Sequence, residues 1–582
     1  MVVLLIISVI FLLLLYVKLK YYTLRGPIPG LSPHFLFGNL IQSGMLLHGK
    51  SPIEIFSEFK SRYGDIFQFW FGPTRYIIVG NVNDIQHIFT NRHIYDQGNM
   101  FIEQFSTLFP NGYITLTGSK HKRHAAIAMP LFRRAKIINN FDLIVDCTDK
   151  LLSNWSAMPS HHVHCDIVRQ CQNLLLEIFG LISFDYNLDT LNEYDSNKNE
   201  LTRALHVFMS SCALVFYSPP IVGTLYTNLN YRHRQAKAII ERHIYQLMDN
   251  EMAQTREARA ERKRTCLIAS LVASLQEDEE AEAKKSEDEK TGLSRVELLH
   301  EILAFMVAGF ETTSTVLAWF IHAMSNYPDV QHKMKEELMS VSVNQNLTLN
   351  QLDSLVYLDC VINEILRFYP ITSGTVRTLT VDDRLPKSSF QLNKGDSVLI
   401  PFYNLAHDTQ HWSIDTESFA PERFLNEDKN HHPYALLPFG GGHRQCIGQA
   451  LARFELKVII ARMLQRVTFG DGGPKINSGG YFTGLTIQPK HVVFNQLFEQ
   501  QRNERDANKP VDQQITLIRD DAGDKVHEND EEQEQEQATS VVRNPNDKLS
   551  NYIAWLGMCK DGAITLEQFE KMVLQLSQEP KK

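Results

Sequence analysis

A single cysteine in a glycine-rich loop constrains this chain more than any other feature. Residues 439–448 read FGGGHRQCIG, with Cys446 two positions after an arginine. Three consecutive glycines let the backbone fold where a β-carbon would clash. The following residues, 449–456, combine strong helix formers with apolar residues at helical spacing, which predicts a helix directly after the cysteine. Free N–H groups at a helix N-terminus favour a thiolate, and such a thiolate is suited to ligate a haem iron.

The loop also matches a specific family pattern. It resembles the cysteine-ligand loop of the cytochrome P-450 family, Phe-x-x-Gly-x-Arg-x-Cys-x-Gly. The matching residues are Phe439, Gly442, Arg444, Cys446 and Gly448. The resemblance implies that Cys446 ligates the haem iron and that Phe439, Gly440 and Gly448 lie against the cofactor. The alternative is a glycine-rich turn around a buried structural cysteine, and five fixed matches in ten residues argue against it.

An apolar segment at residues 303–324 is interrupted at its centre by Glu311 and four hydroxyl residues. Its length suffices for a transmembrane helix, but these polar groups would be costly in lipid. We therefore expect a long buried helix that lines a cofactor pocket. Residues 308–313 resemble the oxygen-binding helix of the family, Ala/Gly-Gly-x-Asp/Glu-Thr-Thr/Ser. The resemblance implies that Thr312 and Glu311 are catalytic and handle protons, while Ala308 and Gly309 lie against the haem.

Three charged residues form a predicted structural group. Glu364 and Arg367 are three residues apart, so they share one face of a predicted helix. The segment Pro421-Glu422-Arg423-Phe424 supplies a second guanidinium in the order that the family uses. By this resemblance Glu364 is a buried carboxylate bracketed by Arg367 and Arg423, which satisfies its oxygens and fixes the fold behind the haem.

The predicted contacts to the haem propionates depart from the family pattern. Arg444 and Arg377 stand where the family has cationic partners. The family helix with Trp-x-x-x-Arg falls at residues 118–125, where His121 replaces the Trp and Ala125 replaces the Arg. Either His121 or His124 substitutes for these contacts, or the haem is held more weakly. The competing interpretation is that both histidines are surface residues on a basic helix.

The N-terminus carries a membrane signal. Residues 2–17 are uncharged, and Lys18, Lys20 and Arg25 follow them. A cleaved signal peptide has its charges before the apolar run, so we predict an uncleaved anchor at residues 1–24. The positive charges on its C-terminal side place the rest of the chain in the cytosol. Residues 25–30, RGPIPG, predict a stiff hinge. Microsomal family members share this arrangement, which implies the endoplasmic reticulum membrane.

The remaining chain divides into three predicted parts. Residues 31–497 are expected to be mainly α, and the resemblance implies the cytochrome P-450 fold, a large helical domain with a small β-rich region around a buried haem. Strand-like patches occur at 65–71 and 76–79. Residues 498–546 are rich in Gln and Glu and predict an acidic disordered linker. Residues 547–582 predict a small helical segment with a degenerate EF-hand, whose lost carboxylates make calcium binding unfavourable, and this tail is a candidate protein contact.

Composition excludes other classes of function. The eight cysteines form no Cys-x-x-Cys pair, which argues against a disulfide framework or a zinc site. The net charge of −9 gives no support to a nucleic-acid partner. No Gly-x-Gly-x-x-Gly fingerprint opens a βαβ unit, so direct binding of NADPH is not expected.

Together these features predict a membrane-anchored haem-thiolate monooxygenase. It would insert one oxygen atom of O₂ into a lipophilic substrate: a steroid, a fatty acid or a foreign compound. The resemblance implies that NADPH acts through a separate NADPH–haemoprotein reductase, which Lys457 and Arg462 would help to steer. Family members that bind haem covalently have a Glu where Ala308 stands, so non-covalent haem b is expected. The alternatives are a haem-thiolate isomerase or dehydratase acting on peroxides, and a non-catalytic haem- or lipid-binding protein.

Overall fold

A 32-residue helix, α15 (Arg295–Asn326), is buried along most of its length and organises the helices around it. Ser294 begins it with a capping box, because the Ser294 hydroxyl accepts the N–H of Glu297 while that carboxylate accepts the N–H of Ser294. By length and composition α15 could cross a membrane, but 83% of its most apolar window is buried inside the protein. The buried helix predicted over residues 303–324 is therefore confirmed.

The computed structural model describes most of the chain up to residue 498. The described residues are 2–158, 163–164, 166–192, 199–218, 220–263, 266–276, 279–341, 347–471, 480–490 and 494–498. All of them except residues 47–49 belong to one unit by their contacts. The predicted acidic linker after its first residue and the predicted segment at 547–582 lie outside the described residues.

Helices make up most of the secondary structure that the structure describes. The first ten α-helices are α1 (Val2–Tyr21), α2 (Pro52–Tyr63), α3 (Val82–Thr90), α4 (Asn99–Phe105), α5 (Gly118–Ala128), α6 (Arg134–Ile137), α7 (Phe141–Ser156), α8 (Ile167–Phe184), α9 (Glu200–Tyr217) and α10 (Pro220–Leu229). Besides α15, the others are α11 (Tyr231–Met252), α12 (Arg256–Arg262), α13 (Leu267–Val272), α14 (Glu279–Ala283), α16 (Pro328–Val341), α17 (Leu349–Asp353), α18 (Val356–Phe368), α19 (Phe402–Ala406) and α20 (Gln449–Arg466). Short 3-10 helices are η1 (Met129–Phe132), η2 (Ile138–Asn140), η3 (Pro421–Phe424) and η4 (Gly442–Arg444).

The strands are short and fall into small sheets. The largest described sheet has the order β1-β2-β8-β5-β3, with β2 and β8 parallel and the other pairs antiparallel. Its strands are β1 (Ile66–Phe71), β2 (Thr74–Val79), β8 (Ser397–Pro401), β5 (Gly374–Leu379) and β3 (Tyr95–Gln97). The others are β4 (Val163–His164), β6 (Asp383–Arg384), β7 (Gln391–Leu392), β9 (Val467–Asp471), β10 (Tyr481–Thr483), β11 (Ile487–Pro489) and β12 (Phe494–Phe498). The strands predicted at 65–71 and 76–79 are confirmed.

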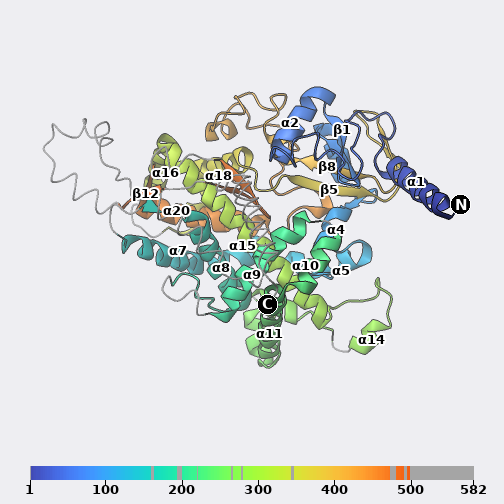
Figure 1. Ribbon diagram of the computed structural model, residues 1–582. Coiled ribbons are helices and arrows are strands. Elements are labelled where there is room, and N and C mark those ends of the chain that lie inside the picture. Colours follow the sequence, from blue (N-terminus) through green and yellow to red (C-terminus); the bar gives the residue numbers. More distant parts are fainter. Residues whose placement is uncertain are drawn as a thin grey trace, which may run out of the picture. The chain divides into compact units, whose positions relative to one another are not determined.

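Two of the three apolar cores among the described residues match this division. The larger one joins α7, α8, α9, α11, α15, α18 and α20, and its fully buried members include Trp155 and Phe320. A smaller one covers the main sheet through side chains such as Ile77, Val398 and Ile400. In Figure 1 the strands β1, β5 and β8 lie together beside α2, and α7, α8 and α11 lie in the helical part. The prediction of a mainly α fold with a small β-rich region is confirmed.

Candidate active site

Backbone hydrogen bonds fix the loop that carries Cys446. The N–H of Cys446 donates to the carbonyl of Phe439 at 2.9 Å, and the N–H of Gln445 donates to that of Gly442 at 3.1 Å. The loop therefore closes on itself before α20 begins at Gln449, as the sequence predicts. Gly448 is the residue before the helix, and a β-carbon there would stand 3.9 Å from the Cys446 sulfur.

Two of the three consecutive glycines adopt backbone angles that other residues avoid. Gly440 has φ of +67° and Gly442 has φ of +69°. A β-carbon on Gly442 would also stand 2.3 Å from the carbonyl oxygen of Phe89, at the end of α3. Only glycine allows the loop to lie this close to α3.

Cys446 combines a surrounded position with an accessible side chain. The residue is exposed by surface area, yet burial by neighbouring protein atoms raises the pKa of its thiol. Backbone N–H groups of Gly448 and Gln449 act in the opposite direction and lower that pKa. The backbone donors are those predicted for a cysteine at a helix N-terminus.

One face of α15 interrupts the burial of this helix. Ala308 is exposed and Thr312 is half-buried, whereas most residues of the helix around them are buried. They are four residues apart and so lie on the same face. The Thr312 hydroxyl donates to the carbonyl of Ala308 at 2.8 Å. This face offers a small apolar surface beside a hydroxyl group.

Gly309 packs against a neighbouring helix. A β-carbon on Gly309 would stand 2.8 Å from the aromatic ring of Phe179 on α8. The missing side chain therefore makes room for packing between α8 and α15, and the position of Gly309 against the haem stays a prediction.

Glu311 is buried, and amide and hydroxyl groups hold its carboxylate. Gln172 donates to one oxygen at 3.0 Å, while Gln488 and Thr486 donate to the other at 2.6 and 3.1 Å. Burial raises the pKa of Glu311, and these hydrogen bonds only partly offset the rise. The carboxyl group therefore retains its proton to a higher pH than an exposed glutamate does.

The two predicted propionate arginines lie in one cluster with an acidic residue. Arg444 donates to Oδ1 of Asp96 from Nη2 at 2.6 Å and from Nε at 3.1 Å. Arg377 is buried, donates to the carbonyl of Gly441 at 3.3 Å, and lies 5.2 Å from the ring centroid of Phe89. Burial, followed by the charge of Arg444, lowers the pKa of Arg377 to about 10, which leaves it charged at neutral pH.

His121 borders the same cluster. Its ring is buried, lies 4.8 Å from that of Tyr113, and has no hydrogen-bond partner for Nε2 among the described residues. Burial and the charge of Arg444 lower the pKa of His121 to about 3, so the ring is neutral. Burial also raises the pKa of the Tyr113 hydroxyl. The charge of Arg444 lowers this pKa, and the charge of Cys446 raises it. The charge of Arg444 in the cysteine loop therefore acts on both His121 of α5 and Tyr113.

His124 has other partners. Its side chain is fully buried, Nδ1 bonds to the Glu301 carboxylate, and Nε2 lies 3.6 Å from Glu297. Both histidines are buried, so the interpretation of His121 and His124 as surface residues is wrong. The structure instead separates them into one ring beside Arg444 and one ring that joins α5 to α15.

The triad predicted to be structural is fully buried. Arg367 donates to the two oxygens of Glu364 at 2.8 Å each, and Nε of Arg423 lies 3.1 Å from Oε2 of Glu364. The N–H of Ala420 adds a further bond to Glu364 at 2.9 Å. The two guanidiniums also donate to carbonyl groups of Ala406, Thr416, Ser418, Ile414 and Asp415. Nη1 of Arg423 donates in addition to the buried carboxylate of Asp428 at 3.1 Å. This network ties α18 to the segment before η3.

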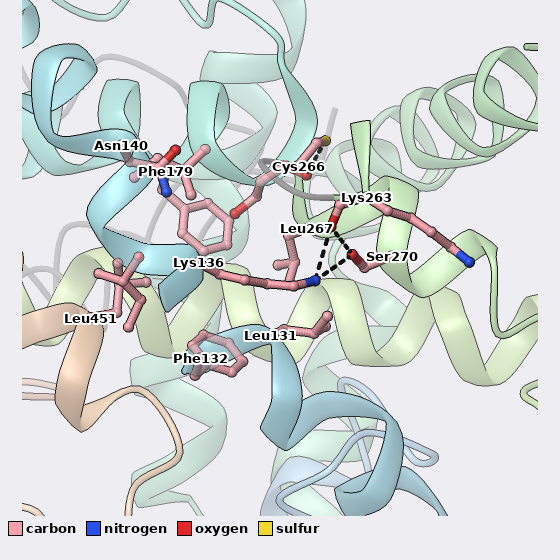
Figure 2. Close-up of a pocket in the computed structure, with 13 residues that line it drawn as sticks. Leu131, Phe132, Lys136, Asn140, Phe179, Lys263, Cys266, Leu267, Ser270 and Leu451 are labelled. Carbon is pink, nitrogen blue, oxygen red and sulfur yellow. Dashed lines mark hydrogen bonds between the residues drawn. The ribbon is translucent and has the colours of Figure 1, made fainter. Parts of the chain in front are cut away.

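A separate pocket lies among η1, α6, α8, α13 and α20 (Figure 2). Lys136 donates there to the carbonyl of Lys263 at 2.9 Å and to the hydroxyl of Ser270 at 3.1 Å. Phe179 lines it on the side toward α15, and Leu451 of α20 also lines it. The described residues that line it include none of the predicted site residues, so we assign it to packing between helices.

Comparison with known proteins gives the chain its family. The model of the cytochrome P450 family matches residues 28–494. The chain belongs to the cytochrome P450 family. Cytochrome P450 3A17 of Cavia porcellus is 28% identical over 466 residues, which cover 76% of this P450 and 85% of that protein.

Two further relatives show how widely this likeness extends. Cytochrome P450 monooxygenase 205 of Postia placenta is 26% identical over 448 residues, covering 70% of this P450 and 80% of that protein. Cytochrome P450 3A7 of Homo sapiens is 28% identical over 356 residues, covering 60% and 67%. This P450 is an oxidoreductase of the monooxygenase class, and its family holds haem through a cysteine thiolate.

The described residues fit such a group. Cys446 is an exposed residue whose thiol has backbone donors, and the α15 face at Ala308 and Thr312 is less buried than the rest of that helix. The Arg377–Arg444 cluster supplies positive charge, and the orphaned Nε2 of His121 supplies a hydrogen-bonding atom for an anionic group. Asp96 in this cluster carries no local sequence signal, because only the pairing of β3 with β5 brings it near Arg377.

Proposed function

We propose that this P450 is a membrane-anchored haem-thiolate monooxygenase in which Cys446 is the iron ligand. The observation that carries the proposal is that the exposed residue Cys446 lies in a loop closed by its own backbone bonds, with N–H groups of Gly448 and Gln449 directed to its thiol. Bound haem would supply the chemistry that cleaves O₂ and transfers one oxygen atom to a lipophilic substrate. Phe439 and Gly440 would pack against the ring in this arrangement.

Thr312 and Glu311 would divide the handling of protons. The Thr312 hydroxyl lies on the open face of α15 and can turn from the Ala308 carbonyl to hydrogen-bond a reacting group. Glu311 lies one residue away with a raised pKa, so it keeps its proton to a higher pH than an exposed glutamate does and can release it to a stronger base. Half-buried Gln172 and Gln488 connect this carboxyl to less buried parts of the protein.

Haem anchoring would combine two guanidiniums with a neutral imidazole. Arg377 and Arg444 would attract the propionates by charge, and His121 would offer the hydrogen of its unpartnered Nε2. The small Ala308 side chain gives no carboxylate for an ester, so the haem b would be held without a covalent bond. Acid–acetone extraction tests this point, and haem that stays with the protein would exclude it.

The substrate would be lipophilic. Phe101, Phe105 and Phe109 form a chain of aromatic contacts, with ring centroids 6.3 and 5.4 Å apart. Phe216 of α9 joins them at 5.2 Å from Phe105. Phe105 and Phe109 are buried in the main core, while Phe101 and Phe216 are half-buried. Aromatic groups of this kind favour apolar molecules and have little selectivity by hydrogen bonding. We therefore retain steroids, fatty acids and foreign compounds as the candidate class.

Membrane association rests on two apolar surfaces. The helix α1 spans 20 residues, and its described side chains from Phe11 to Leu19 include many exposed apolar groups. The helix α10 also exposes apolar side chains, Ile221, Leu225 and Leu229 among them, at helical spacing. We propose residues 1–24 as the anchor in the endoplasmic reticulum membrane, 25–30 as the hinge, and 31–497 as the cytosolic catalytic domain.

Electrons would come from NADPH through the separate reductase. The suggestion that Lys457 and Arg462 steer this partner does not fit the geometry. Lys457 is buried and bonds to Asp359 at 2.7 Å, and Arg462 bonds to Asp149 at 2.6 Å. Their charges are already paired, so other exposed cations would have to guide the reductase.

The carbon monoxide difference spectrum of the dithionite-reduced protein tests the proposal. A strongly red-shifted Soret band that disappears in Cys446→Ser would establish the thiolate ligand. A band like that of histidine-ligated haem, or no haem, would overturn it. Consumption of NADPH with reductase and a lipophilic substrate then separates the monooxygenase from an isomerase acting on peroxides and from a non-catalytic binding protein.

A further inference from the structure

An acidic side chain lies where this P450 would bind the propionates of its haem. Asp96 belongs to β3, whose pairing with β5 sets Gln97 opposite Arg377 and Asp96 opposite Thr378. Oδ1 of Asp96 accepts two hydrogen bonds from Arg444 and lies 3.5 Å from Nε2 of His443. The proposed anchor Arg444 therefore already has a carboxylate partner supplied by the chain.

The charges in this cluster do not favour two more carboxylates. Arg377 and Arg444 contribute two positive charges, and Asp96 cancels one of them. The hydrogen bond with His443 and the charge of Arg444 keep the pKa of Asp96 below its usual range, although burial alone would raise it. His121 is neutral, so it adds no positive charge. Two propionates would thus meet one net positive charge from the arginines.

Partial burial makes the charge of Asp96 effective. The side chain of Arg444 is only 4% exposed and that of Asp96 is 23% exposed. Charges in such partly buried positions are screened less by salt than charges on the surface. A negative charge there opposes both the binding of an anionic cofactor and the addition of an electron to it.

We infer that Asp96 is a tuning residue that weakens the retention of haem and lowers its reduction potential. This inference rests on the proposed haem site at Cys446. Asp96 acts through Arg444 and through its charge, so it is a positioning residue and takes no part in oxygen transfer.

The substitution Asp96→Asn removes the negative charge and keeps the shape of the side chain. Asparagine keeps an oxygen at the position of Oδ1, which also accepts the N–H of Gln97 at 2.7 Å. Asp96→Glu keeps the charge and should resemble the wild type. Asp396→Asn is the matched control, because Asp396, directly before β8, forms a similarly buried pair with Arg75 of β2 at 2.8 Å.

The experiment uses the full-length haem-loaded proteins. A carbon monoxide difference spectrum first establishes whether the wild type and each variant have thiolate-ligated haem, and its failure in the wild type would overturn the proposed function itself. Haem transfer to excess apomyoglobin then gives the rate of loss, and redox titration gives the midpoint potential. Asp96→Asn should slow haem loss by roughly five- to tenfold and shift the potential to a more positive value.

Three results would overturn the inference while leaving the haem site intact. These are unchanged values in Asp96→Asn, faster haem loss in that variant, or equal shifts in Asp396→Asn. Faster loss would mean that Asp96 mainly holds Arg444 in place. Slower haem loss and a more positive potential in Asp96→Asn, with wild-type values in Asp96→Glu, would support the effect of charge.

Discussion

The carbonyl oxygen of Phe89 lies 2.3 Å from the point where a β-carbon would stand on Gly442. The loop that carries Cys446 is thus seated directly on the last turn of α3. Gly442 adopts φ of +69°, which strains any residue with a side chain. The glycine is therefore required twice, by its own conformation and by the approach of a neighbouring backbone.

Gly442→Ala should lose most of its bound haem. The substitution adds a collision with backbone, which cannot turn aside as a side chain can, to a conformational strain of about 1–3 kcal/mol. Gly395→Ala is the control, because Gly395 lies outside the site and has φ of +86° but no atom within 4 Å of its β-carbon position. Haem content per protein and the midpoint of urea unfolding measure both effects. Equal losses in the two variants would show that the contact with Phe89 is unimportant.

Thr312→Val should uncouple electron consumption from product formation. Valine preserves shape but removes the hydroxyl on the open face of α15, so product per NADPH should fall by roughly 10²-fold. Thr313→Val is a matched control, since the Thr313 hydroxyl is buried and donates to the carbonyl of Gly309 at 3.1 Å. The ratio of product to NADPH consumed, measured with reductase, distinguishes them. An unchanged ratio in Thr312→Val would exclude the proposed role.

Glu364→Gln should destabilise the fold. Removing this carboxylate leaves two fully buried guanidiniums without their shared anion, and breaking a buried ion pair costs about 3–5 kcal/mol. Glu422→Gln is the comparison, because Glu422 is half-buried and bonds to the exposed Lys333. Chemical unfolding followed by circular dichroism measures the difference. A loss of activity without a loss of stability would contradict a structural role for Glu364.

Local sequence patterns predicted the parts of the site that local physics determines. The glycines of the loop follow from backbone conformation, and the start of α20 follows from helix propensity. The burial of α15 follows from apolar spacing. Residues that are close in the sequence determine all three properties. Glu364 and Arg367 were also predictable as a pair, because three residues on a helix bring two side chains to one face.

Contacts between distant segments were not predictable in this way. Gly309 faces Phe179 because α8 crosses α15 there, and Glu311 meets Gln488 because the chain returns from beyond α20. Lys457 and Arg462 look like free cations in the sequence, yet each finds an acidic partner on another helix. No spacing rule connects residues that are 90 or more positions apart.

His124→Gln should lower stability more at pH 6 than at pH 8. Burial alone would lower the pKa of His124, but bonds with Glu297 and Glu301 raise it above the ordinary value of about 6.5. A raised pKa in the folded state means that the charged ring adds stability fully below about pH 6.5, and that this stability is lost as the pH rises through the folded value. Arg123 also pairs with Glu297, so this pair of glutamates still has one cationic partner at high pH, where the His124 ring is neutral.

The measurement is the free energy of unfolding of the wild type and His124→Gln between pH 6 and 9. The difference between them should shrink as the pH rises, because the wild type alone loses the contribution of the protonated ring. His332→Gln provides the control, since His332 pairs with Glu336 on an exposed helix surface and such pairs contribute little. A difference that stays constant with pH would mean that His124 is held as a neutral ring and that α5 is joined to α15 by hydrogen bonding without charge.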